Sequence, residues 1–169
     1  MNIKAIIFDL DGTLIDSSDG IVEAFNYALR QFHLPEQPHD KIAPMIGFPL
    51  DHMFVQLAGH SNPELKSAFR KKGMETIVRA SQALPGTNEV VTSLFDTGCK
   101  LGIASTKSRP DIDGILKKLE WREFFEAVIG GDEVSQVKPH PEQFESLLVK
   151  MKSNCANTVV VGDTINDIL

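Results

Sequence analysis

Short apolar segments alternate with helical segments throughout the second half of this sequence. Buried strands are expected at residues 100–105, 127–129 and 158–161, and helical patterns at 110–119 and from Pro141 onward separate them. Two parallel strands need a crossover between them, usually a helix, and that crossover is right-handed in nearly all proteins. The sequence therefore predicts an α/β fold with a parallel, doubly wound sheet.

A further strand is expected near the amino terminus, at residues 4–8, where a short apolar segment stops at an acidic stretch. Between this strand and the later ones, the sequence has only helical patterns. They cover residues 17–32 and 50–58, and a third begins at Pro63 with Asn62 as the expected N-cap. This part of the chain therefore differs in character from the rest.

The domain organisation follows from this difference. The alternation of helices and strands begins only after the Leu84-Pro85-Gly86 segment. We therefore expect an α/β core domain made of residues 1–15 and 84–169, interrupted by an all-helical insertion at residues 16–83.

Polar groups follow the expected strands at their carboxyl ends. Asp9 and Asp11 close the first strand, Ser105 ends the next one, and Asp163 follows the last. In a parallel sheet these ends meet at one edge, where such folds bind ligands. Asp9 and Asp11 are two residues apart, so their carboxylates lie on the same side of an extended backbone, with Leu10 turned into the core. We expect the two acids to share one pocket.

These polar groups form a pattern that resembles a known family. In chain order, its motifs are Asp9-Leu-Asp-Gly-Thr-Leu14, Ser105, Lys138-Pro139 and Gly162-Asp-Thr-Ile-Asn-Asp167. They resemble the four motifs of the haloacid dehalogenase superfamily, and the resemblance spans nearly the whole chain. It implies a Rossmann-like core domain with an inserted all-helical cap domain. The segments 138–141 and 46–50 are most similar to phosphoglycolate phosphatases and β-phosphoglucomutases.

General chemistry and the resemblance together indicate phosphoryl transfer. Asp9 can attack phosphorus to form an acyl-phosphate, which splits one difficult displacement into two easier ones. Asp11 can protonate the leaving oxygen and later deprotonate the attacking water. Carboxylates and a phosphate dianion repel one another, and such hard oxygen ligands suit Mg²⁺, so we expect a magnesium ion. By resemblance, the metal ligands are Asp9, the main-chain carbonyl of Asp11, Asp163 and Asp167, and the phosphate-binding residues are Thr13, Ser105 and Lys138.

Composition limits the partners. The formal charge of −6, from 17 Lys and Arg against 23 Asp and Glu, argues against a nucleic-acid partner. No apolar run approaches the roughly 18 residues that span a bilayer, and the amino terminus lacks the apolar core of a secretion signal. We expect a cytoplasmic monomer or homodimer with no membrane partner, acting on a small phosphorylated metabolite. Cys99 and Cys155 have no His at metal-binding spacing, so both are expected to be buried as small apolar residues.

Two other functions fit part of the pattern. A sugar phosphomutase of the β-phosphoglucomutase type uses the same aspartyl-phosphate but returns the phosphoryl group to a bound hexose. A phosphoaspartate signalling domain, which is not an enzyme, also places acids, a Ser or Thr and a Lys around Mg²⁺, but there the acids come from different strands. Lys107 and Arg109 follow Ser105 closely enough to approach an anionic substrate. The substrate itself stays open, because selectivity rests on contacts from the cap.

The sequence stops just after the fourth motif. By resemblance, related chains continue through a helix to a fifth strand and a closing helix. We therefore expect about 40 further residues in a longer polypeptide, or a partner chain that covers the strand at residues 158–161, which otherwise lies at a sheet edge.

Overall fold

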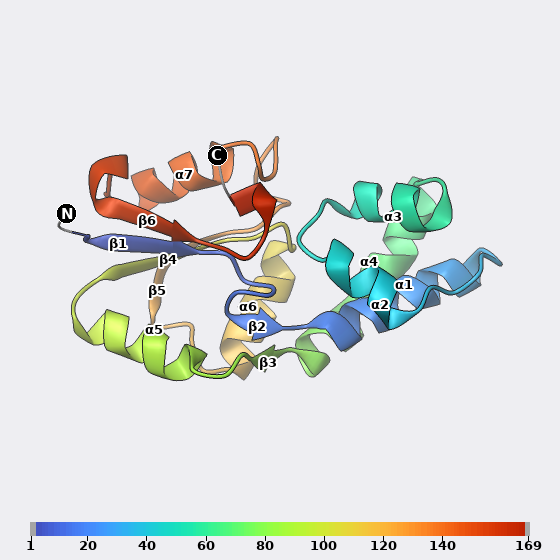
Figure 1. Cartoon of the computed structure of the whole chain (residues 1–169), viewed down its shortest axis with the longest axis horizontal. Coiled ribbons are helices and arrows are strands. Elements are labelled where there is room, and N and C mark those ends of the chain that lie inside the picture. The colour runs from blue at the N-terminus through green and yellow to red at the C-terminus, as the bar shows by residue number, and fades with distance from the viewer. Residues whose placement is uncertain (1–2, 168–169) are drawn as a thin grey trace. The chain divides into compact units, whose positions relative to one another are not determined.

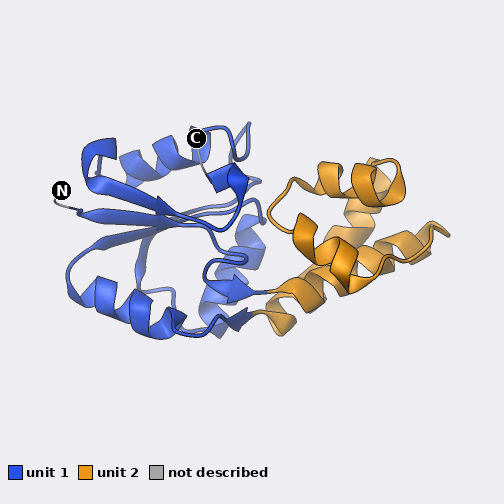
Figure 2. Cartoon of the chain, in the orientation of Figure 1, with its two compact units in different colours: residues 1–16, 82–169 blue, residues 17–81 orange. Residues whose placement is uncertain are grey.

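The computed structural model describes residues 3–167, and the chain divides into two compact units (Figure 2). One unit consists of residues 1–16 and 82–169, and the other of residues 17–81. The chain leaves the first unit after Asp16 and returns to it at Gln82. The sequence placed these two crossings one residue earlier and two residues later, at 15/16 and 83/84.

The first unit is built on a four-stranded sheet. Its strands are β1 (Ala5–Phe8), β4 (Lys100–Ala104), β5 (Phe125–Ile129) and β6 (Thr158–Val161). Their order is β5-β4-β1-β6, and all three pairings are parallel. Phe8, the last residue of β1, lies beside Ile103 on one side and Val161 on the other. The predicted parallel α/β fold is confirmed, and β1 lies between two strands that come much later in the chain.

Helices cover both faces of this sheet. They are α5 (Thr87–Asp96), α6 (Arg109–Lys118) and α7 (Glu142–Lys150). Figure 1 shows α7 on one face and α5 and α6 on the other, as right-handed crossovers require. On the α7 face, Phe144, Leu147 and Met151 pack against Ile7 of β1 and Ile129 of β5. Strand β6 lies at an edge, and its valines 159–161 are each 38–39% exposed.

The second unit is helical. It contains α1 (Ser18–Gln31), α2 (His39–Ile42), a 3-10 turn (Ala43–Met45), α3 (Leu50–Ala58) and α4 (Pro63–Ala80). Helices α1 and α4 approach closely at Gly20, where a methyl group would overlap the backbone of Thr76. The Thr76 hydroxyl donates to the Gly20 carbonyl at 2.9 Å. Asn62 caps α4 as predicted, because its side chain accepts from the N–H of Leu65 at 2.7 Å.

A short antiparallel pair joins the chain at the two crossings. Strand β2 (Ile15–Asp16) pairs with β3 (Gln82–Ala83), with Asp16 opposite Gln82. The sequence predicted only helices for residues 16–83, so β3 was missed. Two residues are too few to show the period of two that marks a strand.

A further expectation concerns the exposure of the two cysteines. Cys155 is exposed and Cys99 is half-buried, and both are free, so the expectation that both are buried was wrong. Cys155 lies in a 3-10 turn (Cys155–Asn157) before β6, where the chain runs over the surface.

None of the helices within residues 3–167 combines the length and apolar composition needed to cross a bilayer.

Candidate active site

The end of β1 holds two acidic residues in buried positions. The N–H of Asp9 donates to the carbonyl of Val161 in β6 at 2.8 Å, so Asp9 still belongs to the sheet. Leu10 is fully buried, and its carbonyl accepts from the N–H of Leu14 at 2.9 Å, so the chain turns back at once. Asp9 is 4% exposed and Asp11 is 8% exposed. Both carboxylates are therefore fixed at the carboxyl end of an inner strand.

The turn after β1 touches the loop after β6. Gly12 has a φ of +83°, and a methyl group on it would overlap the carboxylate of Asp163, so only glycine suits this position. The Thr13 hydroxyl donates to Oδ1 of Asp163 at 3.0 Å. Thr13 was expected to bind phosphate, and here its hydroxyl orients Asp163.

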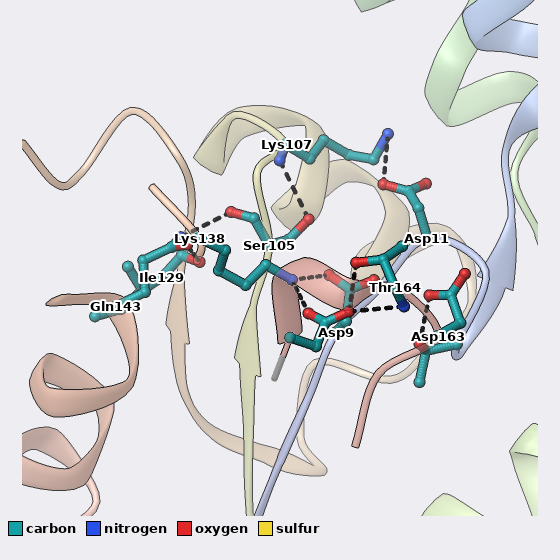
Figure 3. A network of polar contacts seen from close by, with 11 residues as sticks. Asp9, Asp11, Ser105, Lys107, Ile129, Lys138, Gln143, Asp163 and Thr164 are labelled. Atoms are coloured by element: carbon teal, nitrogen blue, oxygen red, sulfur yellow. Dashed lines mark hydrogen bonds and ion pairs between the residues drawn. The ribbon is translucent and has the colours of Figure 1, made fainter. Parts of the chain in front are cut away.

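Lys138 brings a positive charge to the acids from the loop that follows β5. Its side chain is 2% exposed, and its Nζ lies 2.5 Å from Oδ1 of Asp9 (Figure 3). The same Nζ lies 2.5 Å from Oδ1 of Asp167. A buried ammonium needs such partners, because an unpaired charge in the interior is strongly disfavoured. Lys138 therefore links the end of β1 to the loop after β6.

The loop after β6 is closed by its own hydrogen bonds. Oδ2 of Asp167 accepts from the N–H of Thr164 at 3.1 Å and from its hydroxyl at 2.8 Å. Gly162 passes so close to Asp167 that a methyl group there would overlap the carboxylate. These contacts hold Asp167 in one orientation beside Lys138.

Three carboxylates, from the end of β1 and the loop after β6, lie close enough to share a cation. One oxygen each from Asp9, Asp163 and Asp167 lies within 4.8 Å of the others. Oδ2 of Asp9 is buried and accepts no hydrogen bond from any residue between 3 and 167, whereas Asp163 is exposed. A buried acceptor without a donor is unusual in folded proteins. This all-oxygen set fits a hard divalent cation.

The environment of Asp9 shifts its titration. Burial raises the pKa of Asp9 to about 7, although the charge and hydrogen bond of Lys138 lower it, and the neighbouring Asp11 and Asp167 raise it further. Removing a carboxylate from water disfavours its charged form. In the metal-free protein, the ionised form of Asp9 is thus disfavoured relative to a carboxylate in water.

Lys107 connects Asp11 with Ser105. Its Nζ lies 3.2 Å from Oδ2 of Asp11, and its main-chain N–H donates to the Ser105 hydroxyl at 3.2 Å (Figure 3). Ser105 is 1% exposed and follows β4, the neighbour of β1. Ser105, predicted to bind phosphate, therefore reaches the acidic residues through Lys107.

Gln143, a buried residue of α7, also contacts the site, and the sequence did not predict this. Its Nε2 donates to the carbonyl of Ser105 at 2.8 Å and lies 3.4 Å from the carbonyl of Ile129, so it joins the ends of β4 and β5. The signal that could have found it is spacing: Gln143 lies four residues before Leu147 and eight before Met151, and so on the apolar face of its helix. A polar residue at such a position usually has a fixed hydrogen-bond partner.

The structure therefore gathers the predicted site residues at one edge of the sheet. Lys138 contacts both Asp9 and Asp167, and Thr13 donates a hydrogen bond to Asp163. Asp11 and Ser105 are joined through Lys107. A carboxylate that can act as a nucleophile, a second carboxylate, a lysine and a group of hard oxygen atoms in one place suit the displacement of a phosphoryl group.

Comparison with protein families identifies the chain. Residues 6–169 match the model of the haloacid dehalogenase-like hydrolases, and the chain belongs to this family. Two pyrophosphatases named PpaX are similar over the whole chain and 79% of their own length. The protein of Anoxybacillus flavithermus is 34% identical over 172 residues, and that of Bacillus mycoides is 30% identical over 169.

Solved structures agree with this assignment. A haloacid dehalogenase-like family hydrolase of Streptococcus pneumoniae has 28% sequence identity and a TM-score of 0.85, covering 98% of this chain and 78% of that one. A protein described as a predicted phosphoglycolate phosphatase of Haemophilus somnus has 25% identity and a TM-score of 0.85, covering 99% and 80%. The predicted family and the prediction of a phosphatase-type hydrolase are confirmed.

Proposed function

We propose that the chain is a Mg²⁺-dependent phosphatase that hydrolyses a small phosphorylated compound through an aspartyl-phosphate on Asp9. The observation that carries this proposal is the setting of Asp9. Its Oδ2 is buried without a donor among residues 3–167, while its Oδ1 contacts Lys138. Oδ2 is thus free of hydrogen bonds from the described residues and can attack phosphorus or bind a cation. The neighbouring lysine can bind phosphoryl oxygens, and the two further carboxylates can bind the cation.

In the first half of the reaction, Asp9 is the nucleophile. A carboxylate oxygen of Asp9 forms a bond to phosphorus while the bond from phosphorus to the leaving oxygen breaks. Asp11 gives its proton to that leaving oxygen, which departs as an alcohol or an acid. Lys138 offsets the negative charge on the phosphoryl oxygens during transfer. The product of this half is an acyl-phosphate on Asp9.

In the second half, water takes the place of the substrate. Asp11, now a carboxylate, accepts a proton from the water as its oxygen bonds to phosphorus. The bond between phosphorus and Asp9 breaks, inorganic phosphate leaves, and Asp9 is restored. Magnesium, held by Asp9, Asp163 and Asp167 with the main-chain carbonyl of Asp11, supplies positive charge that lets carboxylates and phosphate approach.

The relatives guide the choice of substrates. Those named pyrophosphatase make pyrophosphate a candidate, and the one described as a phosphoglycolate phosphatase makes phosphoglycolate another. By family likeness, we assign the role of a substrate-selecting cap to the helical unit of residues 17–81. Glucose phosphates belong in the same panel, because a phosphomutase would interconvert them without net release of phosphate.

The test is phosphate release from this panel with Mg²⁺, with and without excess chelator. We expect at least one compound to be hydrolysed, and we expect chelator to abolish turnover. Asp9→Asn should abolish turnover while the protein stays folded, because the amide is nearly isosteric but a poor nucleophile. Asp96→Asn, at an exposed position in α5, is the matched control and should leave activity unchanged.

The intermediate can be tested separately. Borohydride reduction during turnover should convert Asp9 to homoserine, detected by peptide mass spectrometry. Retention of more than a small fraction of activity in folded Asp9→Asn protein would refute the nucleophile. An aspartyl-phosphate that persists for minutes without phosphate release would favour the signalling domain.

A further inference from the structure

We propose that Lys107 is a positioning residue that holds the carboxylate of Asp11 where it can exchange a proton with the leaving group. This inference rests on the proposed function, in which Asp11 is the acid and base. Nζ of Lys107 lies 3.2 Å from Oδ2 of Asp11, and the two side chains are only 5% and 9% exposed. The contact joins the residues that follow two neighbouring strands, β4 and β1.

The main chain of Lys107 is fixed on both sides. Its N–H donates to the Ser105 hydroxyl at 3.2 Å, and its carbonyl accepts from the N–H of Gly131 at 2.8 Å. Gly130 and Gly131 let the loop after β5 approach closely, because a methyl group on Gly130 would lie 2.9 Å from the Lys107 carbonyl. The backbone that bears the Lys107 ammonium is therefore held in place. This allows the ammonium to fix the position of another side chain.

The burial of this pair needs a reason other than stability. Two charges removed from water gain little net free energy from each other, and an apolar pair of similar volume is often as stable. An ion pair instead sets the orientation of the carboxylate, because the ammonium holds one of its two oxygens in place. A displacement of about 1 Å in an acid–base group can cost on the order of 10²-fold in rate. Orientation of Asp11 is thus the effect that the geometry of Lys107 provides.

This role predicts a dependence on the leaving group. An alkoxide is a poor leaving group and needs a proton from Asp11, whereas p-nitrophenolate is stable as an anion near neutral pH. Lys107→Met should lower kcat/KM for ethyl phosphate at least about tenfold more than for p-nitrophenyl phosphate. The loss should lie mainly in kcat, because the variant misplaces the acid rather than the substrate.

The matched control is Lys100→Met. Lys100 begins β4, the strand that Ser105 follows, but its Nζ donates to the carbonyl of Met151 at 2.6 Å, and it contacts Glu126. Its loss removes an equal charge from the same domain without touching Asp11. In Lys100→Met, we expect the ratio of kcat/KM for ethyl phosphate to kcat/KM for p-nitrophenyl phosphate to equal the wild-type ratio.

A second comparison works even if Lys107→Met fails to fold. The double variant Asp11→Asn, Lys107→Met removes both charges of the buried pair and leaves neither unpaired. If Lys107 acts through Asp11, the double variant should have the same ratio of rates on ethyl and p-nitrophenyl phosphate as Asp11→Asn alone. A further loss on ethyl phosphate in the double variant would mean that Lys107 acts independently, and would overturn the inference.

The remaining outcomes separate this inference from the proposed function. An active wild type with equal losses on both substrates in Lys107→Met would overturn the positioning role alone. So would a rise in KM confined to phosphoglycolate, whose second anionic group Lys107 would then bind. A folded wild type that releases no phosphate from any compound with Mg²⁺ would overturn the proposed function and, with it, this inference.

Discussion

Asp9 has to meet two opposing requirements. As the proposed nucleophile it must be ionised, yet it is 4% exposed, and burial raises its pKa to about 7 despite the nearby Lys138. In the metal-free protein, the ionised form of Asp9 therefore reduces stability. A divalent cation bound at the proposed site would reverse this effect, because it would favour the charged carboxylate.

This conflict predicts how stability depends on pH. The pKa of Asp9 is raised from 3.8 to about 7, so between these values the folded protein binds more protons than the unfolded chain. Stability then falls as the pH rises through this window, and the whole loss is present above pH 7. In excess chelator, Asp9→Asn should melt several degrees higher than the wild type at about pH 8, and the gain should vanish toward about pH 4.

The measurement is thermal unfolding by circular dichroism across this range of pH. Asp96→Asn, which is exposed, should show no such trend. Added Mg²⁺ should raise the melting temperature of the wild type and leave that of Asp9→Asn nearly unchanged. A metal-free Asp9→Asn protein that melts below the wild type at about pH 8 would contradict the argument.

Helices and strands with clear local signals were the predictable part of the fold. Strand β6 (Thr158–Val161) and helix α3 (Leu50–Ala58) have the expected bounds. The signals are local: an apolar run in one case and a period near 3.6 in the other. Strand β3 (Gln82–Ala83) was not predictable, because its existence depends on pairing with residues 15–16, far away in the sequence.

The same limit applies to the candidate site. The expected strand ends placed Asp9, Asp11 and Ser105 near one sheet edge, because strand ends follow from local patterns. Lys138 was added to this edge by the family resemblance alone. Neither the strand ends nor the resemblance showed that Lys107 pairs with Asp11 or that Gln143 joins two strands. Those contacts depend on the strand order β5-β4-β1-β6 and on how α7 packs on the sheet. Both are defined only in the folded chain.

Helix α4 offers a direct test of a local signal. Asn62 accepts the Leu65 N–H at 2.7 Å, and Pro63 occupies the first helical position. Asn62→Ala should destabilise the protein by about 1 kcal/mol, because the N–H loses its acceptor. Asn62→Asp keeps an acceptor and should retain most of the stability. Urea unfolding measures the free energy of unfolding of both variants. If Asn62→Asp were destabilised as much as Asn62→Ala, the hydrogen-bond acceptor at residue 62 would contribute nothing.

The two crossings between the units are neighbours. Strands β2 and β3 bring Asp16 directly opposite Gln82, so the helical unit enters and leaves the α/β unit at one point. All the predicted site residues belong to the α/β unit. The helical unit is thus an insertion that the α/β unit does not need in order to bring its acids together.

This connection predicts that the helical unit can be removed. Replacing residues 17–81 by Asn-Gly converts β2 and β3 into a hairpin with a two-residue turn of a favoured type. The shortened protein should unfold cooperatively on heating, and Mg²⁺ should raise its melting temperature. The same excision with Asp9→Asn should not respond to Mg²⁺. A shortened protein without a cooperative transition would show that the α/β unit depends on the insertion.

The sheet pairs its earliest strand with its latest one. The strand that carries Asp9 is made early, whereas Asp163 and Asp167 follow β6, which pairs directly with β1. During synthesis, Asp9 therefore precedes by more than 150 residues the two carboxylates that lie beside it in the folded protein. A chain that ends before β6 would therefore lack two of the three carboxylates that lie together at the proposed cation site.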